Sequence, residues 1–170
     1  GPSSAACTLS AQVEIPGVKP GLRDMAKKTA ADHYDDYENI VLTEGQFGYS
    51  AAELLCSDKE GVLVYRDCAI APEAKEITLH LLSKNGCKVE VLINGKTAGS
   101  WQGETRTYVK HPRPVMGPLM VKDTEERIAG WKPVYADVKV ELTHDIQDGQ
   151  RPSELALQMT GDVKLCYFKM

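Results

Sequence analysis

The sequence lacks a long hydrophobic run, an excess of positive charge and a paired-cysteine motif. No stretch approaches the roughly 20 apolar residues of a membrane helix, so no membrane span is predicted. The formal net charge is -4, which disfavours binding to the phosphate backbone of nucleic acids. The five cysteines include no C-x-x-C pair and match no zinc spacing, and their odd number leaves any disulfide pairing open.

The motifs of common catalytic classes are missing as well. The chain has no G-x-S-x-G nucleophile elbow, no EF-hand spacing and no alternation of strands with helices. The acidic cluster at residues 32–38 is interpreted as a solvated turn rather than as a metal site or a pair of catalytic carboxylates. We therefore predict a protein that is not an enzyme, and no metal ligands are identified.

A length of 170 residues is typical of one domain with a full hydrophobic core. Residues 1–21 contain Gly1-Pro2, a pair typical of tag removal, and are interpreted as a tag remnant followed by a linker or an outer strand. Residues 22–170 are predicted to form the domain. Apolar residues recur at helical spacing from Leu22 to His33 and predict a short N-terminal helix.

Beyond about residue 60, apolar and polar residues alternate with the period of two that strands show. This pattern covers residues 76–81, 88–93, 134–142, 154–159 and 163–168. Asn94-Gly95 predicts a hairpin turn whose return strand runs towards Trp101. The fold class is therefore predicted to be all-β, an antiparallel β-sandwich. The long polar segment from Gln102 to Gly130 interrupts the alternation and is predicted to shape a binding surface.

Several segments, in this order, resemble the landmarks of family 6 carbohydrate-binding modules. They are Gly61-Val62-Leu63-Val64-Tyr65, Ile77-Thr78-Leu79-His80-Leu81, Val89-Glu90-Val91-Leu92-Ile93-Asn94-Gly95, Ala129-Gly130-Trp131 and Leu165-Cys166-Tyr167-Phe168. The resemblance extends over roughly residues 60–170. It implies a β-jelly-roll that attaches to a polysaccharide and that belongs to, or acts beside, a glycoside hydrolase.

In that family two aromatic rings clamp a sugar and an amide near the C-terminus supplies hydrogen bonds. Trp131 lies on the motif tryptophan, and Tyr49 is the candidate for the second ring. Lys164 stands where the family usually carries Asn, which favours an anionic or differently shaped ligand. Tyr108, in the long polar segment, and Trp101, at a strand end, are further candidates for stacking on sugars. For Trp131 and Trp101 a role as a core anchor stays open.

The resemblance also implies a structural calcium ion, whose ligand positions read Ala30, Asp32 and Cys166 in this chain. Only one of the three is a carboxylate, so the calcium site is expected to be weakened or lost.

The sequence thus predicts a non-catalytic, secreted or cell-surface module that binds a plant or algal cell-wall β-glycan by aromatic stacking and hydrogen bonds. Its predicted partners are the glycan and a glycoside hydrolase domain. Two alternatives stay open. One is a β-sandwich that packs against a protein or its parent enzyme and ignores sugars. The other is a small hydrolase on the same scaffold.

Overall fold

The computed structural model describes residues 18–84, 86–104 and 134–170, and in these ranges it consists of strands, turns and loops without a helix. The strands are β1 (Arg23–Asp24), β2 (Thr29–Ala30), β3 (Asp36–Glu38), β4 (Ile40–Glu44), β5 (Ser50–Leu54), β6 (Gly61–Ala69), β7 (Glu76–Ser83), β8 (Lys88–Ile93), β9 (Lys96–Gln102), β10 (Tyr135–Glu141), β11 (Ser153–Thr160) and β12 (Val163–Lys169). No helix able to cross a membrane is found in the part of the chain that the structure describes.

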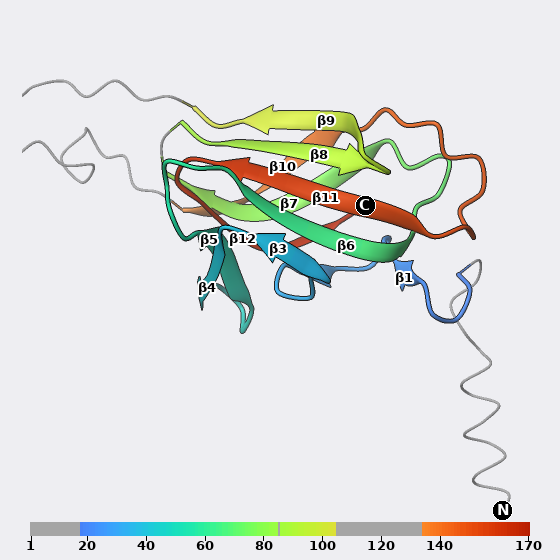
Figure 1. Ribbon diagram of the computed structural model, residues 1–170, viewed down its shortest axis with the longest axis horizontal. Helices are drawn as coiled ribbons and strands as arrows, with labels where there is room; N and C mark the ends of the chain where they lie inside the picture. The colour runs from blue at the N-terminus through green and yellow to red at the C-terminus, as the bar shows by residue number, and fades with distance from the viewer. Residues whose placement is uncertain (1–17, 85, 105–133) are drawn as a thin grey trace, which may run out of the picture.

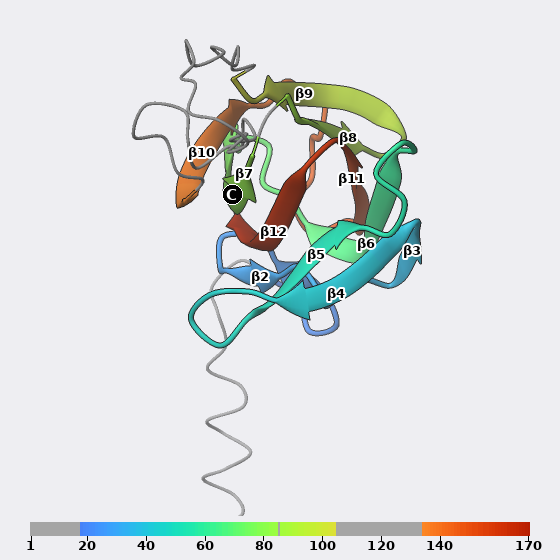
Figure 2. The same ribbon diagram turned by 90° about the vertical axis from the view of Figure 1, so that its left-hand side faces the viewer.

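The strands form two sheets packed face to face (Figure 1). Sheet A has the order β1-β6-β11-β8-β9, and β3 also pairs with β6. Sheet B has the order β10-β7-β12-β5-β4, and β2 also pairs with β12. Seen nearly along the strands, the two sheets enclose the core between them (Figure 2). The predicted fold class, an all-β sandwich dominated by antiparallel pairs, is confirmed.

The core forms because alternating residues of both sheets point inward. Leu155, Leu157 and Met159 from β11 face Ile77, Leu79 and Leu81 from β7, and all six are buried. Across the layers, the Tyr65 and Phe168 rings meet edge-on with centroids 4.8 Å apart. The Tyr65 hydroxyl donates a 2.6 Å hydrogen bond to the Ala31 carbonyl, and burial of this phenol raises its pKa.

The strands predicted beyond residue 60 are confirmed, from β6 through β12. Asn94 and Gly95 have φ angles of 50° and 81°, as a type I′ turn requires, and join β8 directly to β9. The long polar segment predicted to shape a binding surface lies almost wholly outside the described residues. Residues 1–17 also lie outside them, so the predicted tag remnant and linker stay a prediction.

The predicted helix from Leu22 to His33 is wrong. Its backbone pairs with other segments instead: β1 joins β6 in parallel at Cys68, and β2 joins β12 at Tyr167. Met25 is buried, but Ala26, on the same predicted stripe, is exposed. A helix of about 12 residues is marginal alone, so pairing with two sheets already present outweighs the local helical spacing.

Candidate functional site

Four rings stand side by side across the outer face of sheet B. The His80 ring on β7 is stacked between Tyr167 on β12, at 4.5 Å and 7°, and Tyr135 on β10, at 5.5 Å and 8°. Tyr49, just before β5, continues the series with its ring 4.9 Å from that of Tyr167. We call Tyr49, Tyr167, His80 and Tyr135 the aromatic row. Cross-strand ring pairs of this kind stabilise a sheet.

The row exists because the strand pattern of β12 changes at its middle. A register shift between Leu165 and Tyr167 turns Cys166 and Tyr167 towards the outer face, while Phe168 returns to the core. The Cys166 thiol is buried beside Tyr135. Burial, together with this thiol, raises the pKa of the Tyr135 phenol. The outer face of sheet B therefore carries a small buried cluster of its own.

His80 is only 7% exposed and uses both ring nitrogens. Nδ1 lies 2.7 Å from Asp137 Oδ1 on β10, and Nε2 lies 2.7 Å from the Gln46 side-chain amide in the β4–β5 loop. The carboxylate accepts a hydrogen bond from Nδ1–H, whereas the amide can present either its oxygen or its NH₂ group to Nε2. His80 thereby fastens the β4–β5 loop to the sheet.

Phe47 sits at the tip of this loop with 72% of its surface exposed. The Tyr49 N–H donates to the Gln46 carbonyl at 2.9 Å, and Phe47 and Gly48, between them, have φ angles of 54° and 80°. These angles define a type I′ turn, in which a bulky residue is rare and strained. The Phe47 ring lies 5.7 Å from the His80 ring, so an uncovered aromatic surface adjoins the aromatic row.

Charged groups lie beside the row. Lys164 on β12 forms an ion pair with Glu53 on β5, with Nζ and Oε2 3.6 Å apart. Within the row, the Lys28 ammonium lies 4.6 Å from the centroid of the Tyr167 ring. The face therefore offers hydrogen-bond donors and acceptors on both sides of its rings, an arrangement suited to a hydroxyl-rich ligand.

The structure brings together two of the five predicted site residues. Tyr49 and Lys164 lie on the same outer face. Lys164 pairs with Glu53, and Glu53 is two residues along β5 from Ala51, so both point to the face where Ala51 packs against Tyr49. Trp131 and Tyr108 lie outside the described residues. Sequence reasoning missed Phe47 and His80; an aromatic residue immediately before a turn glycine is the signal that points to Phe47.

Trp101 has a different environment from the other candidates. It lies on β9 opposite Val89, and its partly buried ring packs against the main core. The ring also borders a hollow of about 170 Å³ with Lys84 and Val134 at the open end of the sandwich. A role in ligand binding stays a prediction for this residue, separate from the face of the aromatic row.

The residues at the calcium positions do not fit a calcium ion. Ala30 pairs with Tyr167, and the Ala31 N–H donates to the Cys166 carbonyl at 2.8 Å, so the β2 and β12 segments meet as the resemblance implies. However, a methyl group and a buried thiol replace the oxygen ligands that calcium needs. Within the described ranges, no three His, Cys, Asp or Glu side chains gather as a metal site would require.

The cluster at residues 32–38 is tied to neighbouring strands rather than arranged as a catalytic pair. Asp35 accepts hydrogen bonds from the Arg66 backbone N–H at 2.7 Å and from the Arg23 guanidinium at 3.0 Å. The Arg66 hydrogen bond, with the charge of Arg23, lowers the pKa of the Asp35 carboxyl.

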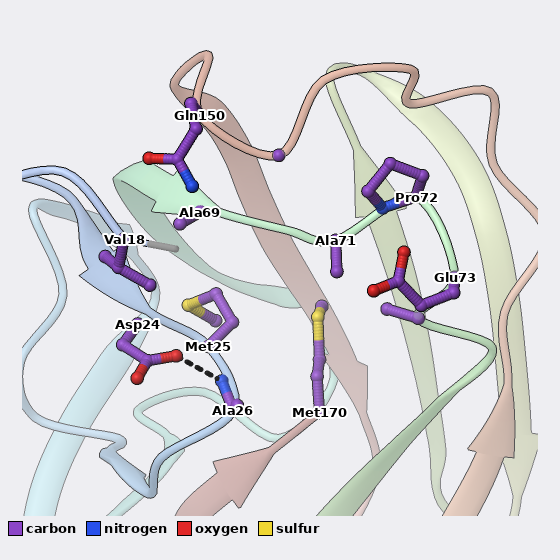
Figure 3. Close-up of a pocket in the computed structure, with 12 residues that line it drawn as sticks. Val18, Asp24, Met25, Ala26, Ala69, Ala71, Pro72, Glu73, Gln150 and Met170 are labelled. Atoms are coloured by element: carbon purple, nitrogen blue, oxygen red, sulfur yellow. Dashed lines mark hydrogen bonds between the residues drawn. The ribbon is translucent and has the colours of Figure 1, made fainter. Parts of the chain in front are cut away.

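A separate cavity of about 460 Å³ opens near β1 (Figure 3). Met25, Met170 and alanines line it, and Figure 3 shows the Glu73 carboxylate turned towards it. Asp24 is its second acidic residue, and its carboxylate accepts a hydrogen bond from the Ala26 N–H at 3.0 Å. We call this the methionine cavity. It lacks the exposed ring surface found beside the aromatic row.

No family model matches the chain, and no curated protein matches it. Solved structures do. CsCBM6-3 from Clostridium stercorarium, in complex with cellobiose, aligns with a TM-score of 0.61 at 15% identity over 89% of this chain and 97% of its own. A family 6 carbohydrate-binding module from Clostridium cellulolyticum, in complex with xylose, aligns with a TM-score of 0.61 at 13% identity over 86% and 98%.

A third similar structure belongs to a larger protein. A glycoside hydrolase family 43 arabinoxylan arabinofuranohydrolase from Bacillus subtilis, in complex with cellotetraose, aligns with a TM-score of 0.60 at 10% identity. The alignment covers 88% of this chain and 28% of that one. These likenesses show that the chain has the β-sandwich fold of family 6 carbohydrate-binding modules.

Proposed function

We propose that this protein is a non-catalytic carbohydrate-binding module that attaches to a cell-wall β-glycan through the outer face of sheet B. The observation that carries the proposal is Phe47, an exposed ring held in a strained turn beside the aromatic row. A strained backbone conformation whose cost is not offset by burial of the side chain is typical of functional positions. The ring offers an apolar face on which the C–H groups of a sugar can stack.

The groups around Phe47 supply the hydrogen bonds that such a ligand needs. Asp137, which is exposed, and the Lys164–Glu53 pair offer donors and acceptors to sugar hydroxyls at the surface of the same sheet. Between Lys164 and Lys169 on β12 the face extends for about 17 Å at the usual rise of a strand. A short oligosaccharide therefore has room to lie across it.

The similar structures support the proposal, because two of them are modules in complex with cellobiose or xylose. The third is a glycoside hydrolase of which the matching region is about a quarter. By this analogy we propose that the module is secreted or held at the cell surface and directs an associated glycoside hydrolase to its glycan. Tyr49 and Lys164 are proposed as further contacts at this face. Trp131 is proposed as a further sugar-binding residue, with Tyr108 and Trp101 as lesser candidates.

Affinity electrophoresis tests the proposal. The protein is run through gels that contain xylan, β-glucan, a cellulose derivative, a galactan or pectin. Retardation by at least one polysaccharide is expected, and the Phe47→Ala variant is expected to lose about tenfold in affinity, since one stacked ring contributes roughly 1 kcal/mol or more. Trp131→Ala is run beside it and is expected to weaken retardation as well.

Tyr37→Ala is the matched control, because Tyr37 is also an exposed aromatic residue, at 53%, but lies on β3 at the edge of sheet A. Its retardation should equal that of the wild type. Equal losses of affinity in the Phe47 and Tyr37 variants would contradict the assignment of the sugar-binding site to the outer face of sheet B. Free migration through every gel would instead favour the protein-packing alternative, for which exposed Leu55 and Val134, at 66% each, would be the contacts to test.

A further inference from the structure

A hollow of about 610 Å³ lies on the outer face of sheet B and reaches Tyr167 of the aromatic row. Separate segments contribute its four lysines: Lys28 precedes β2, Lys75 precedes β7, Lys139 lies on β10, and Lys169 lies near the end of β12. Tyr167, from the aromatic row, and Thr78 form part of the same lining. We call this the lysine hollow.

The lysine hollow has an excess of positive charge in a protein whose net charge is -4. Of its two acidic residues, Glu76 lies 3.8 Å from the Lys139 ammonium, and Asp137 is bound to His80. Lys28, Lys75 and Lys169 have no carboxylate partner within the ranges that the structure describes. Three ammonium groups around one hollow repel each other, and an anion bound between them would offset this repulsion.

The neighbouring methionine cavity has the opposite charge. Ala74 and Met170 line both spaces, so the two lie back to back. The methionine cavity contains Asp24 and Glu73 and no lysine or arginine. An anionic group is therefore attracted to the lysine hollow on one side of Met170 and repelled from the methionine cavity on the other. The positive charge is thus confined to the hollow and does not belong to a generally basic surface.

The position of Lys28 connects this charge to the proposed sugar-binding face. Its ammonium lies over the Tyr167 ring, the ring that stacks directly on His80. A saccharide bound against the Tyr167 ring would place its substituents beside Lys28, and the Thr78 hydroxyl can donate a further hydrogen bond there.

We propose that the glycan is anionic and that Lys28, Lys75 and Lys169 form the subsite for its carboxylate or sulfate group, an inference that rests on the proposed function. Uronic acids and sulfated sugars share this chemistry. An ammonium group binds either one as a point charge, without the planar geometry that arginine would impose.

The test compares acidic glycans with matched neutral ones in affinity gels. The gels contain glucuronoxylan or its carboxyl-reduced form, and a sulfated galactan or its desulfated form. Wild-type protein is expected to be retarded by at least one acidic member and less by its neutral counterpart, and retardation should weaken with added NaCl. Which acidic member binds distinguishes a carboxylate from a sulfate ligand.

The Lys28→Gln/Lys169→Gln variant is expected to lose roughly tenfold in affinity for the acidic glycan, as the loss of two partly screened ion pairs allows. The control is Lys59→Gln/Lys88→Gln, which makes the same change in net charge at two exposed lysines, one in the turn after β5 and one on β8 of sheet A. The control should bind like the wild type, and both variants should keep the wild-type thermal transition.

The outcomes separate the subsite from the module. Retardation by neutral glycans alone, unchanged in the Lys28→Gln/Lys169→Gln variant, would overturn the anionic subsite and leave the sugar-binding function in place. Equal losses in both variants, or equal retardation by double-stranded DNA, would also overturn it, because the binding would then follow net charge only. Migration unaffected by every glycan would overturn the proposed function as well.

Discussion

Two hairpin turns in this protein share one backbone geometry and differ in the residue that occupies it. In sheet A, Asn94 precedes Gly95, and in sheet B, Phe47 precedes Gly48; the two non-glycine φ angles are 50° and 54°. Asn is a preferred residue at this position, and its side chain also binds the Glu154 N–H at 2.8 Å. Phe47 has neither advantage and is exposed. The first turn is built for stability, and the second carries a ring towards solvent at the expense of stability.

The outer faces of the two sheets differ in the same sense. Along β11, in the middle of sheet A, the outward residues are Glu154, Ala156, Gln158 and Thr160, and none of them is aromatic. The corresponding face of sheet B carries the aromatic row, fixed by the hydrogen bonds of His80. The outer face of sheet A is an ordinary solvated surface. The side chains on the outer face of sheet B are held in place before any ligand binds, and such preorganisation favours binding.

The largest expected effect comes from removing the centre of the aromatic row. His80→Ala deletes a nearly buried ring that is stacked on both sides, together with two hydrogen bonds, and should lower the free energy of unfolding by about 3 kcal/mol. Chemical denaturation measures this change. The matched substitution on sheet A, Gln158→Ala, should change stability by no more than about 0.5 kcal/mol. Equal effects on both faces would show that the row does not order sheet B.

Exchanging the residues of the two turns should produce smaller effects of opposite sign. Asn94→Phe loses the hydrogen bond to Glu154 and introduces turn strain, so the free energy of unfolding should fall by about 2 kcal/mol. Phe47→Asn relieves the strain and should raise it by about 1 kcal/mol while it weakens glycan retardation. Thermal denaturation and affinity gels measure the two properties. A destabilised Phe47→Asn variant would mean that the ring stabilises the fold and is not held there for binding.

Much of the sandwich could be predicted because its central strands follow simple alternation. The strands β7, β8, β11 and β12 agree with the predicted ranges to within two residues, and the turn predicted at Asn94-Gly95 is present. The first strands could not be predicted in this way. The strands β1 and β2 have two residues each and are defined by partners more than 40 residues away, Cys68 and Tyr167 respectively, so local spacing favoured a helix.

The candidate site was predictable only in part, for a related reason. The resemblance to the family led to Tyr49 and Lys164, which lie on one face in the structure. His80 lies within an alternating strand, and its sequence context gives no sign that Tyr135 and Tyr167 enclose its ring from neighbouring strands. The lysine hollow is equally hidden, since residues 28, 75 and 169 meet only through the sheet order.

The central claim is that sugars bind on the outer face of sheet B, and an NMR titration of isotope-labelled protein tests it most directly. Cello-, xylo- and glucuronoxylo-oligosaccharides are added in turn. The account predicts that at least one of them shifts the amide signals of Phe47, Tyr49, His80 and Tyr167 and leaves those of β8 and β11 unchanged. Shifts confined to sheet A, or an unchanged spectrum with all three ligands, would contradict it.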